Sequence, residues 1–169
     1  MDTQKKIQMA GALLSANKAS FLSDSRLCAL LSELDSAISA SREAMEKAGV
    51  VEICRRCDEE EGGSCCGEGM ERHYDEWLLL ANLLMGVKLQ KERQEARSCL
   101  FLGERGCTLW ARHTICINYL CLEITKCIDP ARLSELRRRE GKELELLFHT
   151  IEYLKLFVRE YGCQVETKP

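Results

Sequence analysis

The sequence predicts a mainly α-helical protein, a small helical bundle enclosing an irregular cysteine-rich core with a short β-hairpin. Three observations support this fold class. The chain of 169 residues contains only two prolines and is rich in residues that favour helix. Segments on both sides of its centre repeat apolar residues at helical spacing. Between these segments, residues 54–121 hold eight of the eleven cysteines.

Length and composition fit a single domain over residues 1–169. We divide it into N-terminal helices (1–49), a cysteine cluster core (54–121) and a C-terminal helix (129–162). The composition, 46% hydrophobic and 30% charged, is typical of soluble globular proteins. The net charge of −3 gives no reason to expect a nucleic-acid partner. No apolar run approaches the length of a membrane span, and we find no signal peptide.

These bounds predict a cytoplasmic protein with no membrane partner. Such a compartment is reducing, so clustered cysteines bind metal or do redox work more often than they form structural disulfides.

The N-terminal third predicts two helices. Residues 1–20 give a weak helical signal. Residues 24–49 give a clear one, with Ser23 or Asp24 as N-cap and Gly49 as a left-handed stop. Their apolar stripe must be covered, most simply by another helix.

The middle of the chain alternates loops and helix. Asp58 to Gly69 contains four acidic residues in a row and four glycines, which predicts a loop. Residues 70–87 predict a helix that is apolar nearly all round, and therefore the most buried one. The charged residues 88–97 predict a solvated continuation or a second short helix. Two short apolar runs around a glycine-bounded turn in residues 99–110 predict the hairpin.

Residues 130–161 predict the last helix, with Asp129 as N-cap and Pro130 at its first position. Gly141 is expected to break or bend this helix at a cost of about 1 kcal/mol relative to alanine.

The cysteines between residues 54 and 121 are the candidate metal ligands, because soft metals need several thiolates converging from different parts of the backbone. The spacing Cys54-x-x-Cys57 lets two sulfurs chelate one ion, although dithiol redox centres share it. The side chains of the vicinal Cys65 and Cys66 tend to point apart, which favours separate ions or a single ligand. The eight candidate ligands are Cys54, Cys57, Cys65, Cys66, Cys99, Cys107, Cys116 and Cys121.

Cys116 and Cys121 lie five residues apart, so a straight helix would place them on different faces. They converge only if the segment unwinds or if they serve separate centres. Three cysteines lie outside the pattern. We interpret Cys28 as a small buried hydrophobe, Cys163 as a free thiol, and exclude Cys127 less firmly.

The order and context of these cysteines resemble the YkgJ-type cysteine cluster family, described as a putative zinc- or iron-chelating domain. The eight candidate ligands fall on its eight cysteine positions in order. The segments Leu100-Phe101-Leu102 and Gly106 to Trp110 match its middle, and Arg112 matches its arginine. Seven residues rather than two separate Cys57 from Cys65, and His113 and Ile117 depart from the pattern. A flagellin lysine methylase carries a related pattern, which implies an iron–sulfur role for some relatives.

The sequence therefore predicts a protein that binds an iron–sulfur cluster, slightly preferred, or zinc, in a structural, electron-transfer or maturation role. His113 is expected to be a hydrogen-bonding neighbour more often than a ligand. The alternative is a thiol-redox enzyme using Cys54 and Cys57. A third hypothesis is a plain helical interaction protein with incidental thiols. No carboxylate or histidine constellation indicates a catalytic metal, so enzyme activity stays open.

Overall fold

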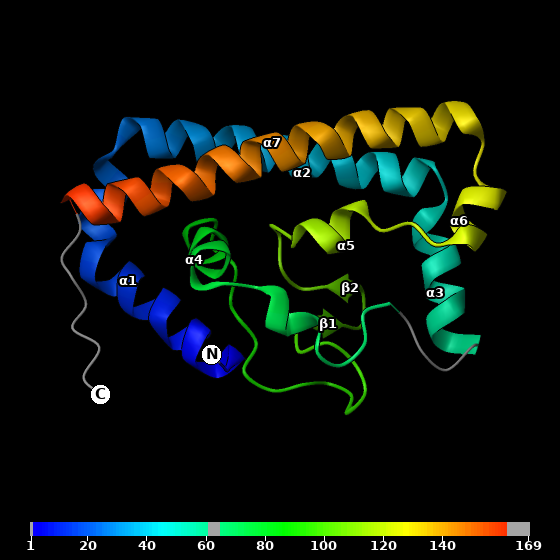
Figure 1. Ribbon diagram of the computed structural model, residues 1–169, viewed down its shortest axis with the longest axis horizontal. Coiled ribbons are helices and arrows are strands. Elements are labelled where there is room, and N and C mark those ends of the chain that lie inside the picture. The colour runs from blue at the N-terminus through cyan, green and yellow to red at the C-terminus, as the bar shows by residue number, and fades with distance from the viewer. Residues whose placement is uncertain (1, 61–64, 162–169) are drawn as a thin grey trace.

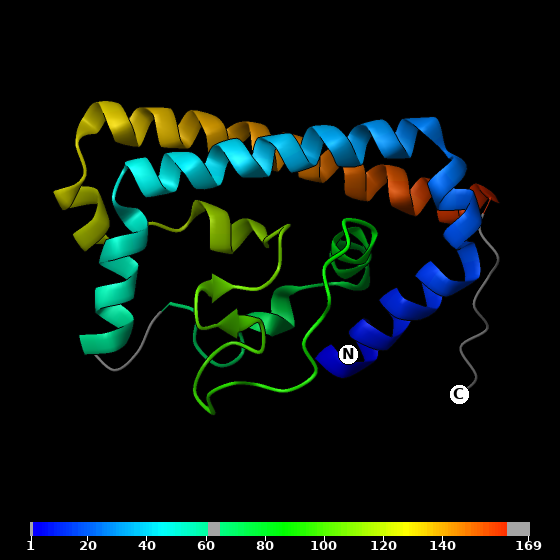
Figure 2. The same ribbon diagram turned by 180° about the vertical axis from the view of Figure 1, so that it is seen from behind.

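The computed structural model describes residues 2–60 and 65–161, with residues 58–60 described by their backbone only. The fold is mainly helical, as predicted. Two long antiparallel helices, α2 (Ser25–Lys47) and α7 (Pro130–Tyr161), lie side by side along the whole length of the molecule (Figures 1 and 2). This pair forms one layer, and the remaining elements lie beneath it.

The elements beneath the long pair gather at two ends and a centre (Figure 1). At one end, α1 (Thr3–Ser23) packs against α4 (Glu76–Leu84). At the other end lie α3 (Val50–Glu60) and α6 (Leu122–Cys127). The centre holds the 3₁₀ helix η1 (Met70–His73), the antiparallel strands β1 (Leu102–Gly103) and β2 (Gly106–Cys107), and α5 (Thr114–Asn118).

The helix boundaries follow local capping chemistry. Asp24 caps α2 by accepting the Leu27 N–H at 2.6 Å. Gly49, with φ of +80°, ends the turn after α2 in the left-handed region that glycine tolerates. Asp129 accepts the N–H groups of Ala131 and Arg132 at 3.1 Å and thereby starts α7 at Pro130. The predicted caps and both long helices are confirmed.

Two hydrophobic clusters hold these elements together. The main core joins α1, α2, α4, α5 and α7 with the hairpin, and its fully buried members include Phe21, Leu34, Phe101 and Leu154. The second cluster is smaller and joins the end of α2 to α3, α6 and the start of α7 through Val50, Ile124, Ile128 and Leu136. The molecule is therefore built on a large core and a small one, at different places along the long pair.

Four local predictions were wrong in whole or in part. Residues 58–60, expected in the loop from Asp58 to Gly69, belong to α3, which packs Val50 and Ile53 in or against the second cluster. The single helix predicted over residues 70–87 is divided into η1 and α4. Tyr74 is extended between them, and the Asp75 side chain starts α4 afresh by accepting the Leu78 N–H at 2.8 Å.

Residues 88–97 form neither a helical continuation nor a second helix. The Arg93 side chain instead ties this irregular segment to the main body. Gly141, expected to break or bend α7, does not break it, since the helix runs through this residue to Tyr161. Among the described helices, none is both long enough and apolar enough to cross a membrane.

Candidate functional site

The ten cysteines that the structure describes form no disulfide with one another, and Cys163 lies outside the described residues. Cys28 and Cys127 are exposed. The interpretation of Cys28 as a buried hydrophobe is therefore wrong. Cys28 lies in the first turn of α2, and its thiol donates weakly to the Leu22 carbonyl at 3.7 Å. The eight candidate ligands fall into two sets that differ in position and burial.

The inner set consists of Cys66, Cys99, Cys107 and Cys116, which all pack in or against the main core. Backbone bonds bring three of them together. The Cys99 N–H donates to the Cys66 carbonyl at 2.7 Å, beside a β-bridge between Gly67 and Ser98. In the hairpin, Leu102 pairs with Cys107, which returns the chain to the segment that starts at Cys99. The predicted hairpin is confirmed, and it carries one thiol of the set.

Tyr74 joins Cys116 to the inner set. Its side chain is 1% exposed, and its ring meets Phe101 edge-on with centroids 5.2 Å apart. The hydroxyl oxygen accepts the His113 N–H at 3.1 Å, which leaves its hydrogen to point towards Cys116 Sγ, 3.7 Å away. A buried tyrosine hydroxyl thus donates to one candidate ligand. A donor of this kind stabilises negative charge on sulfur.

The outer set consists of Cys54, Cys57, Cys65 and Cys121. Cys54 and Cys57 lie three residues apart on α3, so they share one face of the helix. Cys121 is the N-cap residue of α6, and it packs against the second cluster with Ile53, the neighbour of Cys54. Cys54 and Cys65 are exposed, whereas Cys57 and Cys121 are half-buried. Cys54, Cys57 and Cys121 thus lie on or next to α3 and α6, at one end of the molecule (Figure 1). Cys65 belongs with them because its thiol adds to the rise in the pKa of Cys54.

The chain between Cys116 and Cys121 does not form one helix. It ends α5 at Asn118 and begins α6 at Leu122, with Tyr119 extended between them. The helix is therefore interrupted between Cys116 and Cys121, as their convergence on one centre would require. However, the break places the two cysteines in different sets, Cys116 beside Tyr74 and Cys121 beside α3.

Burial raises the pKa values of four of these thiols, those of Cys54, Cys66, Cys99 and Cys107. Burial raises the pKa of Cys66 to about 12, and the thiols of Cys107, Cys116 and Cys99, and to a smaller extent Cys54 of the outer set, add to the effect. Burial likewise raises the pKa of Cys99 to about 11. In the outer set, burial and then the thiols of Cys121, Cys65 and Cys57 raise the pKa of Cys54. A metal ion must therefore displace protons from these sulfurs, and its binding depends on pH.

Two arginines bring positive charge to the inner set. Burial raises the pKa of the Cys107 thiol, whereas the charges of Arg112 and Arg42 oppose the rise. Arg42 is held by the Leu109 carbonyl at 2.8 Å and lies 4.6 Å from the Trp110 ring centroid. Glu143, buried on α7, balances both arginines, and burial raises the pKa of its carboxyl group. Thiolate charge at Cys107 thus has cationic neighbours.

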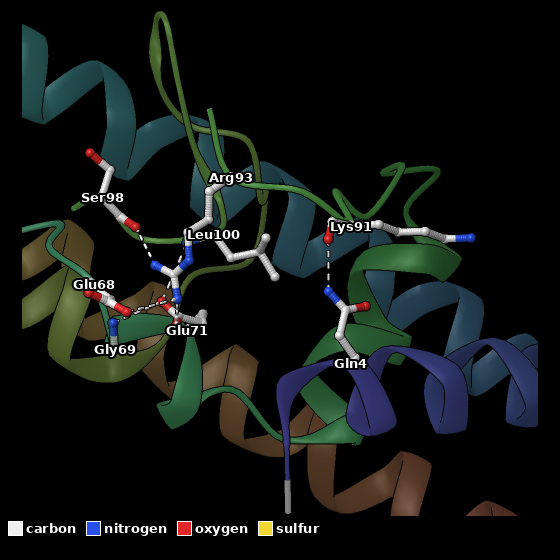
Figure 3. A network of polar contacts seen from close by, with 8 residues as sticks. All are labelled: Gln4, Glu68, Gly69, Glu71, Lys91, Arg93, Ser98 and Leu100. Atoms are coloured by element: carbon white, nitrogen blue, oxygen red, sulfur yellow. Dashed lines mark hydrogen bonds and ion pairs between the residues drawn. The ribbon is translucent and has the colours of Figure 1, made fainter. Parts of the chain in front are cut away.

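A buried ion pair fixes two of the cysteine-bearing loops (Figure 3). Glu71 is 3% exposed and pairs with Arg93. Its carboxylate also accepts the Gly69 N–H at 3.1 Å and the Leu100 N–H at 3.4 Å, while Arg93 donates to the Ser98 carbonyl. Gly69 lies three residues after Cys66, and Leu100 is the residue after Cys99. One carboxylate therefore holds both loops in place.

His113 has a structural role. It is the N-cap residue of α5, and its Nδ1 accepts the Ile115 N–H at 3.2 Å. Its ring lies 5.5 Å from that of His73, and burial lowers its pKa. Within the part of the chain that the structure describes, no three His, Cys, Asp or Glu side chains already stand at metal-binding distances. The thiols of each set are neighbours, but the described side chains do not yet form a site that could coordinate a metal ion.

No family model, curated protein or solved structure matches the chain. The resemblance to the cysteine cluster family therefore stays a prediction, and the proposed site rests on the geometry of its own residues.

Sequence reasoning missed the residues that support the thiols. Tyr74 looked like an apolar helix position, and Arg93 like part of a solvated run. Burial of their polar ends is a long-range property, so no local signal identified them.

Proposed function

We propose that this protein binds a thiolate-ligated metal centre, an iron–sulfur cluster or zinc, through the eight cysteines of the inner and outer sets. One observation carries the proposal: eight cysteines from separate segments fall into two neighbouring sets of four. Four thiolates are what a closed zinc site takes, and also what a four-iron cluster takes. Incidental cysteines of a helical protein would have no reason to be grouped in this way.

The surroundings of the inner set fit such a centre. Four thiolates around Zn²⁺ or a cluster carry net negative charge, which Arg42 and Arg112 offset near Cys107. The Tyr74 hydroxyl donates to Cys116 and would hold that sulfur as a thiolate. Because no three ligands among the described residues stand ready, binding requires the loops to close by a local rearrangement, which couples metal affinity to loop stability.

The alternative function, a dithiol redox enzyme using Cys54 and Cys57, has less support. Reactive dithiols rely on a lowered thiol pKa. Here burial and the neighbouring thiols raise the pKa of Cys54. The structure also gives Cys54 two further thiol neighbours, Cys65 and Cys121, which a two-cysteine redox mechanism does not need.

Metal analysis of protein purified without oxygen tests the proposal. A brown protein with iron and acid-labile sulfide would contain a cluster, and a colourless one with zinc would contain closed zinc sites. We expect the Cys107→Ser/Cys116→Ser variant to bind less metal than wild type, and the Cys28→Ser/Cys127→Ser variant, which changes exposed thiols outside both sets, to bind as much. Wild-type protein that contains neither metal and takes up neither in reducing buffer would refute the proposal.

A further inference from the structure

We propose that the eight thiols form two separate metal centres of different exchange rate. The inner centre, with Cys66, Cys99, Cys107 and Cys116, retains its metal. The outer centre, with Cys54, Cys57, Cys65 and Cys121, exchanges its metal with thiophilic ligands in solution. This inference rests on the proposed function and specifies how the site is divided.

The division follows the two hydrophobic clusters. All four inner cysteines belong to or pack against the main core, with Cys99 only 7% exposed. Cys121 packs instead against the second cluster beside Ile53, so it lies with α3 and not with Cys116. A single centre that used all eight sulfurs would have to take ligands from segments packed against both clusters.

The inner segments are held by several independent bonds. The Cys99–Cys66 backbone bond, the hairpin pairing at Cys107 and the Glu71 carboxylate fix three segments. Tyr74 fixes the fourth at Cys116. A metal bound there leaves only when part of the main core opens, which is slow because core opening requires a large free energy.

The outer segments are held by much less. Cys54 and Cys65 are exposed, and the two helices that carry or adjoin the set are the 11-residue α3 and the six-residue α6. The small second cluster supports α3 and α6. An incoming thiolate ligand can therefore reach the metal and replace one protein sulfur at a time. The metal changes ligands without any change of oxidation state, and each released cysteine takes up a proton.

Zinc release from the full-length, reduced protein tests the inference. The chain is loaded with Zn²⁺ without oxygen, and release to a chromophoric chelator is followed over time. We expect about two zinc ions per chain, released in two phases, the first about tenfold faster or more. Cys57→Ser/Cys121→Ser should remove the fast phase and leave one zinc that leaves at the unchanged slow rate.

The reverse variant, Cys107→Ser/Cys116→Ser, should remove the slow phase. If this variant does not fold, the Cys57→Ser/Cys121→Ser variant alone tests whether the fast phase belongs to the outer centre. Cys28→Ser/Cys127→Ser serves as the matched control and should keep both phases. One zinc per chain, or a single release rate that is altered by every ligand variant, would overturn the two-centre inference while leaving the proposed function intact. Wild-type protein that binds neither zinc nor a cluster would refute both.

Discussion

The hydroxyl group of Tyr74 is the residue-scale feature that most directly links fold and site. Tyr74→Phe keeps the buried ring against Phe101 but removes the donor to Cys116 and the acceptor for the His113 N–H. We expect a loss of roughly 1–2 kcal/mol in the free energy of unfolding, because one buried N–H loses its partner. We also expect zinc bound by the inner set to be released on the order of tenfold faster.

Urea denaturation and chelator-release kinetics measure these two effects. Tyr119→Phe is the matched control, since it removes the same hydroxyl group from a side chain that is 57% exposed. If Tyr74→Phe released zinc at the wild-type rate, its hydroxyl would have only a structural role.

Glu71 predicts a specific dependence of stability on pH. Burial alone would raise the pKa of its carboxyl group, but backbone N–H donors and Arg93 outweigh burial and lower it. A lowered folded-state pKa means that the carboxylate stabilises the fold above the ordinary value of 4.5. That contribution is lost as the pH falls from there through the folded-state pKa.

Glu71→Gln should therefore destabilise the protein at pH 7, by roughly 2–3 kcal/mol, because Arg93 loses its partner while it is itself partly solvated. The difference between variant and wild type should shrink as the pH falls below 4.5. Denaturation at several pH values measures this. Glu43→Gln, which breaks an exposed pair with Lys47, is the control and should change little. A difference that stayed constant with pH would contradict the role given to the Glu71 charge.

At the scale of elements, two glycines predict opposite effects of the same substitution. Gly106 has φ of +95° in the hairpin turn, so Gly106→Ala should destabilise the protein by roughly 1–2 kcal/mol. Gly141 lies inside α7, and an added methyl group would meet no described atom within 4 Å. Gly141→Ala should therefore stabilise the protein by about 1 kcal/mol. Thermal denaturation of both variants measures this, and equal signs would contradict it.

The elements predicted correctly from sequence are those with strong local signals. The apolar period of α2 and α7, and the caps at Asp24 and Asp129, are contained in a few neighbouring residues. The divided helix at Tyr74 was not predictable in this way. Its extended conformation is accompanied by two long-range bonds, to His113 and Cys116, that the local apolar pattern does not reveal.

The candidate site shows the same limit. The cysteine pattern names eight candidate ligands, but their spacing along the chain does not divide them four and four. Cys116 and Cys121 are close in sequence and fall in different sets, because the break between α5 and α6 turns one towards Tyr74 and the other towards α3. The division depends on which hydrophobic cluster each cysteine packs against, and that is decided by the whole fold.

At the scale of the whole molecule, the helical frame and the thiol sets are carried by different elements. No cysteine of either set lies on α1, α2, α4 or α7, and these four helices supply most of the main core. The frame should therefore stay folded without metal, unlike small zinc-binding domains that unfold when the ion is removed. Metal should add stability to an already folded chain.

This separation leads to the last prediction. Chelation should lower the thermal midpoint by about 5–10 °C, because a ligand at a hundred times its Kd stabilises by about 2.7 kcal/mol and each kcal/mol shifts a chain of this size by roughly 2–4 °C. The helical circular dichroism at 25 °C should barely change, since the long helices α1, α2 and α7 carry no cysteine of either set. Melting curves of loaded and chelated protein measure both quantities. Loss of most helix on chelation would show that the metal holds the frame itself. An unchanged midpoint would show that the thiols bind no metal in the folded state.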